Sequence, residues 1–285
     1  MDKHAFRMPA VLSAFIAIAV MFGCEKSDTE APKDDAVSGA SPVPFETGVF
    51  ETLQASRSIV IHCGNSMRPA AEEIAAWFQK IHKIGVKFNF GGSSQLLPSI
   101  ELGEEGDLYI CHDPYADTLE SKDLLERYVV VGYLEPIIIV APGNPRGIKS
   151  LEDLARPGLR LALTDERYTR SGKLVQQAFS EMGLQDQLKA NEKMTGRSHN
   201  DVATALLAGE LDAGIVWNFI ATFYRGRLDF VQPGIEFPET RVTICLLKNA
   251  TDREAAGKFI DMAASKKGGE VFQRHGYTKL REYSE

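Results

Sequence analysis

Residues 58–110 decide the fold, and they read SIVIHCGNSMRPAAEEIAAWFQKIHKIGVKFNFGGSSQLLPSIELGEEGDLYI. Short apolar runs typical of buried strands alternate in this stretch with segments whose apolar residues recur every three or four positions, as in helices. The predicted strands are 58–62, 86–90 and 107–110, and the predicted helices are 70–81 and 96–102. This strand–helix alternation predicts a parallel sheet with helices on its faces.

A second series of the same kind follows along the chain. We predict strands at 134–140, 159–163, 213–217 and 241–247, and helices at 171–182, 201–208 and 252–274. The predicted fold class is therefore α/β with two lobes, each a mostly parallel sheet flanked by helices, and a ligand cleft between the lobes. We assign residues 51–134 and 237–285 to the first lobe and residues 135–236 to the second.

Three short stretches place a small hydroxyl residue where a predicted strand turns into a helix. They are Gly64-Asn65-Ser66, Gly91-Gly92-Ser93-Ser94 and Arg170-Ser171-Gly172. The first turn of a helix leaves backbone N–H groups unpaired and carries a partial positive charge, so it holds an anion without a basic side chain. A serine at the N-cap adds a hydroxyl donor. Three such ends in one chain indicate a shared anion site.

The N-terminus has the pattern of an export signal. Lys3 and Arg7 precede the apolar run 11–22, which is too short to span a bilayer comfortably. We predict that residues 1–23 are a signal peptide. The sequence Met21-Phe22-Gly23-Cys24 resembles a bacterial lipobox, which implies lipidation of Cys24 and a membrane tether. Residues 24–50 contain almost no large apolar residue and are predicted to be a disordered tether.

The charge balance excludes one class of partner. The 285 residues carry a formal net charge of −7, and the sequence contains no basic tract interleaved with aromatic residues. Nucleic-acid binding needs such a basic footprint, so we expect no nucleic-acid partner. We expect a monomer whose partner is a small solute.

Several motifs resemble those of the periplasmic molybdate-binding proteins of transport systems. They are Gly91-Gly92-Ser93-Ser94-Gln95-Leu96 with Ser99-Ile100-Glu101, then Gly106-Asp107-Leu108-Tyr109-Ile110, Asp113, Asp165-Glu166, Asp201-Val202, Gly214-Ile215-Val216-Trp217 and Phe272-Gln273-Arg274-His275-Gly276-Tyr277. The resemblance covers about residues 58–280. It implies the two-lobed type II periplasmic binding fold, capture of molybdate or tungstate for an ABC transporter permease, and neither catalysis nor a cofactor.

The resemblance also implies five ligand-binding residues. Ser66 and Ser93 match the two serines of the first lobe that donate hydroxyl and backbone hydrogen bonds. Ser171 stands where the family usually has alanine, and Val202 where a backbone N–H is donated. Trp217 stands where the family usually has a tyrosine, and its indole donates one hydrogen bond from a different reach and angle.

Three arginines depart from the neutral donors of the molybdate proteins. Arg68, Arg170 and Arg197 lie beside matched segments, and arginine prefers bidentate contacts with carboxylate or phosphate. They are additional candidate anion contacts. They leave open a binding protein for a different anion.

Two Cys–His pairs support further alternatives. His62-Cys63 ends the first predicted strand and Cys111-His112 ends the third, and these strands are expected to be neighbours. A disulfide between the two cysteines, buried thiols, a metal-ion site and a thiol-dependent enzyme all remain open. Cys245 is expected in the core.

Overall fold

The computed structural model describes residues 57–278, so the predicted signal peptide, Cys24 and the predicted tether lie outside the described residues. The first lobe is built on a five-stranded sheet in which β1 pairs in parallel with β2 and β3, while β10 is antiparallel to β3 and β4. In spatial order the strands are β2 (Gly85–Gly91), β1 (Ser58–Gly64), β3 (Leu108–His112), β10 (Thr240–Leu247) and β4 (Leu125–Leu134).

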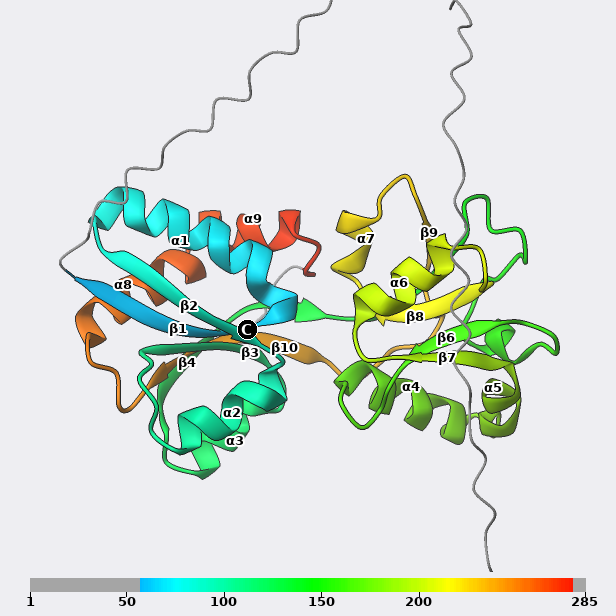
Figure 1. Cartoon of the computed structure of the whole chain (residues 1–285), viewed down its shortest axis with the longest axis horizontal. Coiled ribbons are helices and arrows are strands. Elements are labelled where there is room, and N and C mark those ends of the chain that lie inside the picture. The colour runs from blue at the N-terminus through cyan, green and yellow to red at the C-terminus, as the bar shows by residue number, and fades with distance from the viewer. Residues whose placement is uncertain (1–56, 279–285) are drawn as a thin grey trace, which may run out of the picture. The chain divides into compact units, whose positions relative to one another are not determined.

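Helices cover both faces of this sheet (Figure 1). One face is packed by α1 (Arg68–His82), α8 (Arg253–Ala264) and α9 (Lys266–Arg274), and the other by α2 (Ser93–Glu101) and α3 (Tyr115–Ser121). On α1 the buried residues recur at helical spacing, with Ile74 and Phe78 fully buried. Burial of this stripe against the sheet is the hydrophobic driving force for the lobe.

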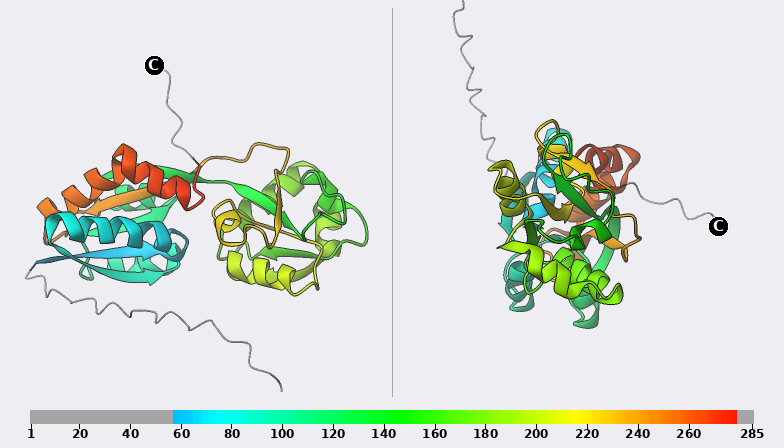
Figure 2. Two further views of the ribbon diagram at one scale, coloured as in Figure 1. Left: turned by 90° about the horizontal axis from the view of Figure 1, so that it is seen from above. Right: turned by 90° about the vertical axis from the view of Figure 1, so that its right-hand side faces the viewer.

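The second lobe repeats the arrangement (Figure 2). Here β6 pairs in parallel with β7 and β8, and β5 is antiparallel to β8 and β9. The spatial order is β7 (Glu192–Gly196), β6 (Leu161–Thr164), β8 (Ala213–Trp217), β5 (Pro136–Val140) and β9 (Asp229–Val231). One face is covered by α4 (Arg170–Glu181), α5 (Gln185–Asn191) and the 3-10 helix Glu152–Ala155, and the other by α6 (His199–Leu207) and α7 (Ile220–Phe223).

The predicted two-lobed α/β class is confirmed, with the detail that each sheet is mixed. The predicted continuous strand 134–140 is wrong: β4 ends at Leu134, β5 begins at Pro136, and the two strands belong to different sheets. Hydrophobicity alone does not mark the break, because only Glu135 interrupts the apolar run. The chain passes between sheets there and returns between β9 and β10. The lobe boundaries at 134/135 and 236/237 stay a prediction.

The strand register excludes the disulfide. In the β1–β3 pair Cys63 lies opposite Ile110, so Cys63 and Cys111 point to opposite faces of the sheet. Cys63, Cys111 and Cys245 are all free and buried. Among residues 57–278 no helix is long and apolar enough to cross a bilayer.

Candidate functional site

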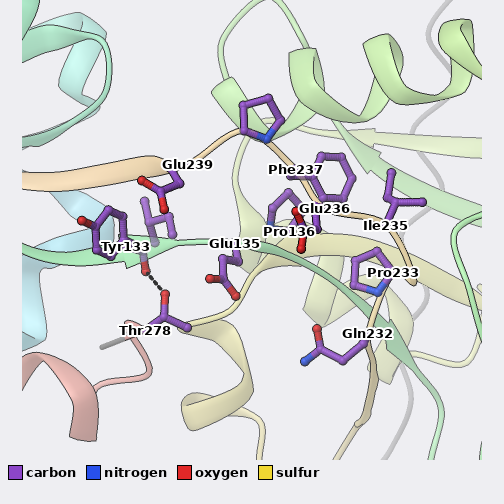
Figure 3. A pocket seen from close by; sticks show the side chains of 12 residues that line it. Tyr133, Glu135, Pro136, Gln232, Pro233, Ile235, Glu236, Phe237, Glu239 and Thr278 are labelled. Carbon is purple, nitrogen blue, oxygen red and sulfur yellow. Dashed lines mark hydrogen bonds between the residues drawn. The ribbon is translucent and has the colours of Figure 1, made fainter. Parts of the chain in front are cut away.

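Of several hollows in the described residues, the one along the segments that join the lobes is acidic. It has a volume of about 600 Å³ and follows the connecting chains, where Thr278 Oγ1 donates to the carbonyl of Tyr133 (Figure 3). Its wall carries the carboxylates of Glu135, Glu236 and Glu239. Three carboxylates repel an anion, so this hollow does not have the chemistry that the sequence predicts.

A smaller cavity has that chemistry. Its volume is about 140 Å³, roughly five water volumes at about 30 Å³ each, which suits a small ion. Its wall comes from both lobes and is rich in hydroxyl, imidazole and guanidinium groups. We call it the cleft; the lining residues are Asn65, Ser66, Gly92, Ser93, Ser94, His112, Tyr115, Tyr168, Thr169, Arg170, Arg197, Ser198, His199 and Trp217.

Three helices begin at the cleft. Helix α2 starts at Ser93 after the N-cap Gly92, α4 starts after Thr169, and α6 starts after Ser198. The hydroxyls of Thr169 and Ser198 accept hydrogen bonds from first-turn backbone N–H groups of their own helices, at 3.1 and 3.2 Å. The remaining first-turn N–H groups and the helix dipoles favour negative charge in the space between them. The cleft is thus suited to an anion.

Buried tyrosines hold the serine turns of the first lobe. Tyr109 Oη donates to the carbonyl of Ser93 at 2.6 Å, and Tyr277 Oη donates to the carbonyl of Ser66. A Cβ atom at Gly64 would lie 2.4 Å from Met67 Cε and 2.6 Å from Ser93 Oγ, so the glycine makes room for both side chains at the end of β1. These contacts fix both hydroxyl-bearing turns at the cleft.

The second lobe supplies the arginine side chains that line the cleft. Arg170 lines the cleft, where its Nε donates to Thr240 Oγ1 at 2.9 Å and its Nη2 to the backbone carbonyl of Glu239 at 3.5 Å. Arg197 is exposed at the rim. The indole of Trp217 is buried, and its ring centroid lies 5.8 Å from that of His199.

Two histidines in the wall are neutral. Burial, with the positive charge of Arg170, lowers the pKa of His112, although its hydrogen bond to Asp113 opposes the shift. Burial and then the neighbouring His112 lower the pKa of His199 to about 3. Near neutral pH both rings therefore act as dipolar hydrogen-bonding groups and not as cations.

The structure brings together five of the eight predicted anion contacts. Ser66, Ser93, Arg170, Arg197 and Trp217 line the cleft, and their part in ligand binding stays a prediction.

The other three do not line the cleft. Ser171 is fully buried with its Oγ 3.0 Å from Thr164 Oγ1, because α4 begins one residue before Ser171 and turns its side chain inward. Val202 is fully buried, and its N–H points to the carbonyl of Ser198 at 3.4 Å. Arg68 pairs with Glu72 at 2.8 Å and lies 4.4 Å above the Phe90 ring. The expected serine N-caps are also wrong, since Gly92 and Thr169 are the caps.

Sequence reasoning missed His199 as a cleft residue. The sequence predicts a helix that starts at Asp201, whereas α6 starts at His199 behind a capping box of Ser198 and Asp201. The Ser-x-x-Asp spacing was the available signal. The missed lining residues also include Tyr115, Tyr168 and Thr169.

The alternatives built on cysteine lose support. No group of three or more metal-ligating side chains occurs within residues 57–278. Burial raises the pKa of the Cys63 thiol and of the Cys111 thiol, so neither forms a thiolate nucleophile at neutral pH.

The geometry agrees with comparisons to known proteins. Residues 59–278 match the family described as bacterial extracellular solute-binding protein, and the chain belongs to that family. The molybdate-binding protein ModA of Mycobacterium bovis is 25% identical over 238 residues, covering 79% of this chain and 86% of that protein.

Solved structures share the fold. The periplasmic molybdate-binding protein of Azotobacter vinelandii superposes with a TM-score of 0.67 at 16% identity, covering 78% of this chain and all of that one. The sulfate-binding protein SubI of Mycobacterium tuberculosis gives 0.67 at 18% identity, covering 79% and 88%. The chain therefore has the type II periplasmic binding fold, and its family is one of extracellular solute-binding proteins and not of enzymes.

Proposed function

We propose that the cleft captures a small oxyanion, molybdate or tungstate, and that the protein delivers it to a membrane permease. The observation that carries this proposal is the start of three helices, α2, α4 and α6, at one cavity of about 140 Å³. A tetrahedral oxyanion presents acceptors in several directions, and the surrounding wall supplies donors from both lobes. The molybdate-binding relative and neighbour support the choice of ion.

The energetics of such capture need no covalent step. A hydrogen bond to a charged group contributes about 1.5–3 kcal/mol, and a micromolar complex requires about 8 kcal/mol. A few donors on each side of the cleft meet that requirement after the costs of association. Since both lobes donate, binding favours closure of the lobes about the connecting segments.

Arginine-dependent capture of a different anion is the second candidate. It is favoured by the positions of Arg170 and Arg197 on the wall, and by a sulfate-binding neighbour with the same fold. Under this alternative, phosphate, sulfate or a small carboxylate binds more tightly than molybdate, because the guanidinium groups supply most of the attraction.

Thermal unfolding with a panel of anions tests the proposal. A ligand at about a hundred times its dissociation constant stabilises the folded protein by roughly 2.7 kcal/mol. We expect molybdate and tungstate to raise the melting temperature, while sulfate, phosphate and small carboxylates do not. A shift with only one of the latter supports the second candidate. No shift with any of these anions contradicts both.

We also propose that Cys24 carries a lipid that anchors the protein outside the cytoplasm, on the Gly23-Cys24 pattern after the apolar run. Fractionation of cells that express the Cys24→Ala variant tests this. The wild type is expected in the membrane fraction and the variant outside it; equal distribution contradicts the anchor.

A further inference from the structure

The hydrogen bond of His112 fixes where its proton lies. Its Nδ1 is 2.7 Å from the carbonyl oxygen of Asp113. A carbonyl oxygen only accepts, so Nδ1 carries the hydrogen and donates it. In the neutral ring Nε2 then has a bare lone pair. Among the described residues no side chain is hydrogen-bonded to this Nε2, and His112 lines the cleft.

His199 has the opposite arrangement. It is 93% buried, since only 7% of its surface is exposed, and its Nδ1 is enclosed without a hydrogen-bond partner. An enclosed, unpaired N–H is less tolerable than an unpaired acceptor, so we assign the hydrogen to Nε2. Nε2 is not among the enclosed atoms, and His199 lines the cleft. This ring therefore offers an N–H donor.

The surroundings keep His112 neutral until a ligand arrives. The charged or titratable groups around it are Arg170 from α4, His199 from α6, Tyr115 from α3, and Asp113 beside it on the chain. The Asp113 carboxylate accepts from the Arg241 backbone N–H at 2.7 Å and from its guanidinium, and although its charge still raises the pKa of His112, burial is the larger effect and lowers it. Arg170 repels a second positive charge on the ring.

An oxyanion in the cleft would meet one mismatched group. The serines, the arginines and His199 can donate to its oxygens, whereas the Nε2 lone pair of neutral His112 faces them as a second acceptor. Two acceptors in contact repel unless a hydrogen lies between them. A fully ionised oxyanion such as molybdate has no hydrogen to supply, while hydrogen phosphate has one.

We propose that His112 makes the cleft bind a small oxyanion together with one proton, held between His112 Nε2 and a ligand oxygen. A fully ionised oxyanion takes this proton from the buffer acid, which leaves as its conjugate base. An oxyanion that retains a hydroxyl brings its own. This inference rests on the proposed anion-binding function and makes His112 a specificity-determining residue for that site.

Calorimetric titration of the purified full-length protein with sodium molybdate tests the inference. Repeating the titration in buffers of different ionisation enthalpy counts the protons exchanged. We expect uptake of one proton at about pH 8 and an affinity that falls about tenfold per pH unit as the pH rises further. Binding with no proton exchange and constant affinity overturns the inference. If neither molybdate, tungstate, sulfate nor phosphate binds at any pH, the proposed function itself fails.

Variants of the histidines test whether the proton uptake on binding depends on His112 itself. In His112→Asn the amide Nδ2 takes the place of the ring Nδ1 beside the Asp113 carbonyl, but nothing titrates, so we expect no proton uptake and pH-independent affinity. The matched control is His82→Asn at the last residue of α1, which does not line the cleft and should keep the uptake of one proton. His199→Gln should weaken binding and leave the proton count unchanged. Retained uptake in His112→Asn contradicts the assignment.

Discussion

Both lobes use a buried aspartate to link a central strand to its neighbour, but the other hydrogen-bond partners of the two aspartates differ. In each lobe a buried aspartate precedes a central strand and exchanges two hydrogen bonds with a residue in the neighbouring strand or just before it. Asp107 pairs with Val60 through bonds of 2.8 Å in both directions, and Asp212 pairs with Arg160 through bonds of 2.7 and 2.8 Å. The other oxygen of Asp107 accepts from the backbone N–H groups of Thr251 and Asp252, whereas Asp212 accepts from exposed arginine side chains.

The walls of the cleft differ in a related way. The first lobe contributes hydroxyls and neutral rings, represented by Ser66, Ser93 and Tyr115, while the second contributes Arg170 and Arg197. Equivalent sheets therefore carry unlike walls, one neutral and one charged. Strand order sets the position of the site in the fold, whereas the residues at the first turn of each helix set its chemical character.

Replacing the two buried aspartates should change stability strongly and to different degrees. Asp107→Ala leaves three backbone N–H groups without their partner, at about 1–3 kcal/mol for each buried one, so we expect a loss of more than about 3 kcal/mol in the free energy of unfolding. Asp212→Ala should cost less, because water can solvate its two half-exposed arginine partners. Urea unfolding at neutral pH measures both. Equal losses would show that the lobes do not differ in this respect.

The next effect concerns the neutral wall. If Ser93 donates to the ligand as proposed, Ser93→Ala removes that donor, and we expect affinity for molybdate to fall about 10- to 150-fold, which corresponds to about 1.5–3 kcal/mol. Ser99→Ala on the same helix does not alter the cleft wall and is the matched control. Titration calorimetry compares them. A Ser93→Ala protein that binds as tightly as the control argues against a neutral-donor site.

The two arginines of the charged wall should contribute less to molybdate affinity than Ser93 does. Arg170 already donates to Thr240, and Arg197 is exposed, so their attraction is partly screened. We expect each alanine variant to lose about two- to fivefold in affinity, with the loss shrinking as salt is added. If Arg170→Ala weakens binding more than Ser93→Ala does, an arginine-clamped anion replaces molybdate as the ligand.

The sequence predicts the strands of the sheets better than it predicts the residues that line the cleft. The apolar runs of β1, β2 and β3 give the first sheet, because burial leaves a periodic signal. The position of a helix start is less visible: a one- or two-residue error hides His199 and turns Ser171 from a wall residue into a core residue. The lone-pair orientation of His112 depends on a single contact with Asp113, which no sequence pattern encodes.

Replacing Arg68 should have little effect on ligand binding, because this residue adjoins the serine turn in sequence but does not line the cleft. Its guanidinium pairs with Glu72 four residues along α1 and lies above Phe90, so its charge is already matched and its side chain is held away from the cleft. Arg68→Ala should therefore change molybdate affinity by less than about twofold, while the loss of an exposed pair costs no more than about 1 kcal/mol of stability. Titration calorimetry with molybdate measures the affinities of Arg68→Ala and Arg170→Ala side by side. A loss as large as that of Arg170→Ala would give the first lobe a charged wall of its own and remove the contrast between the lobes.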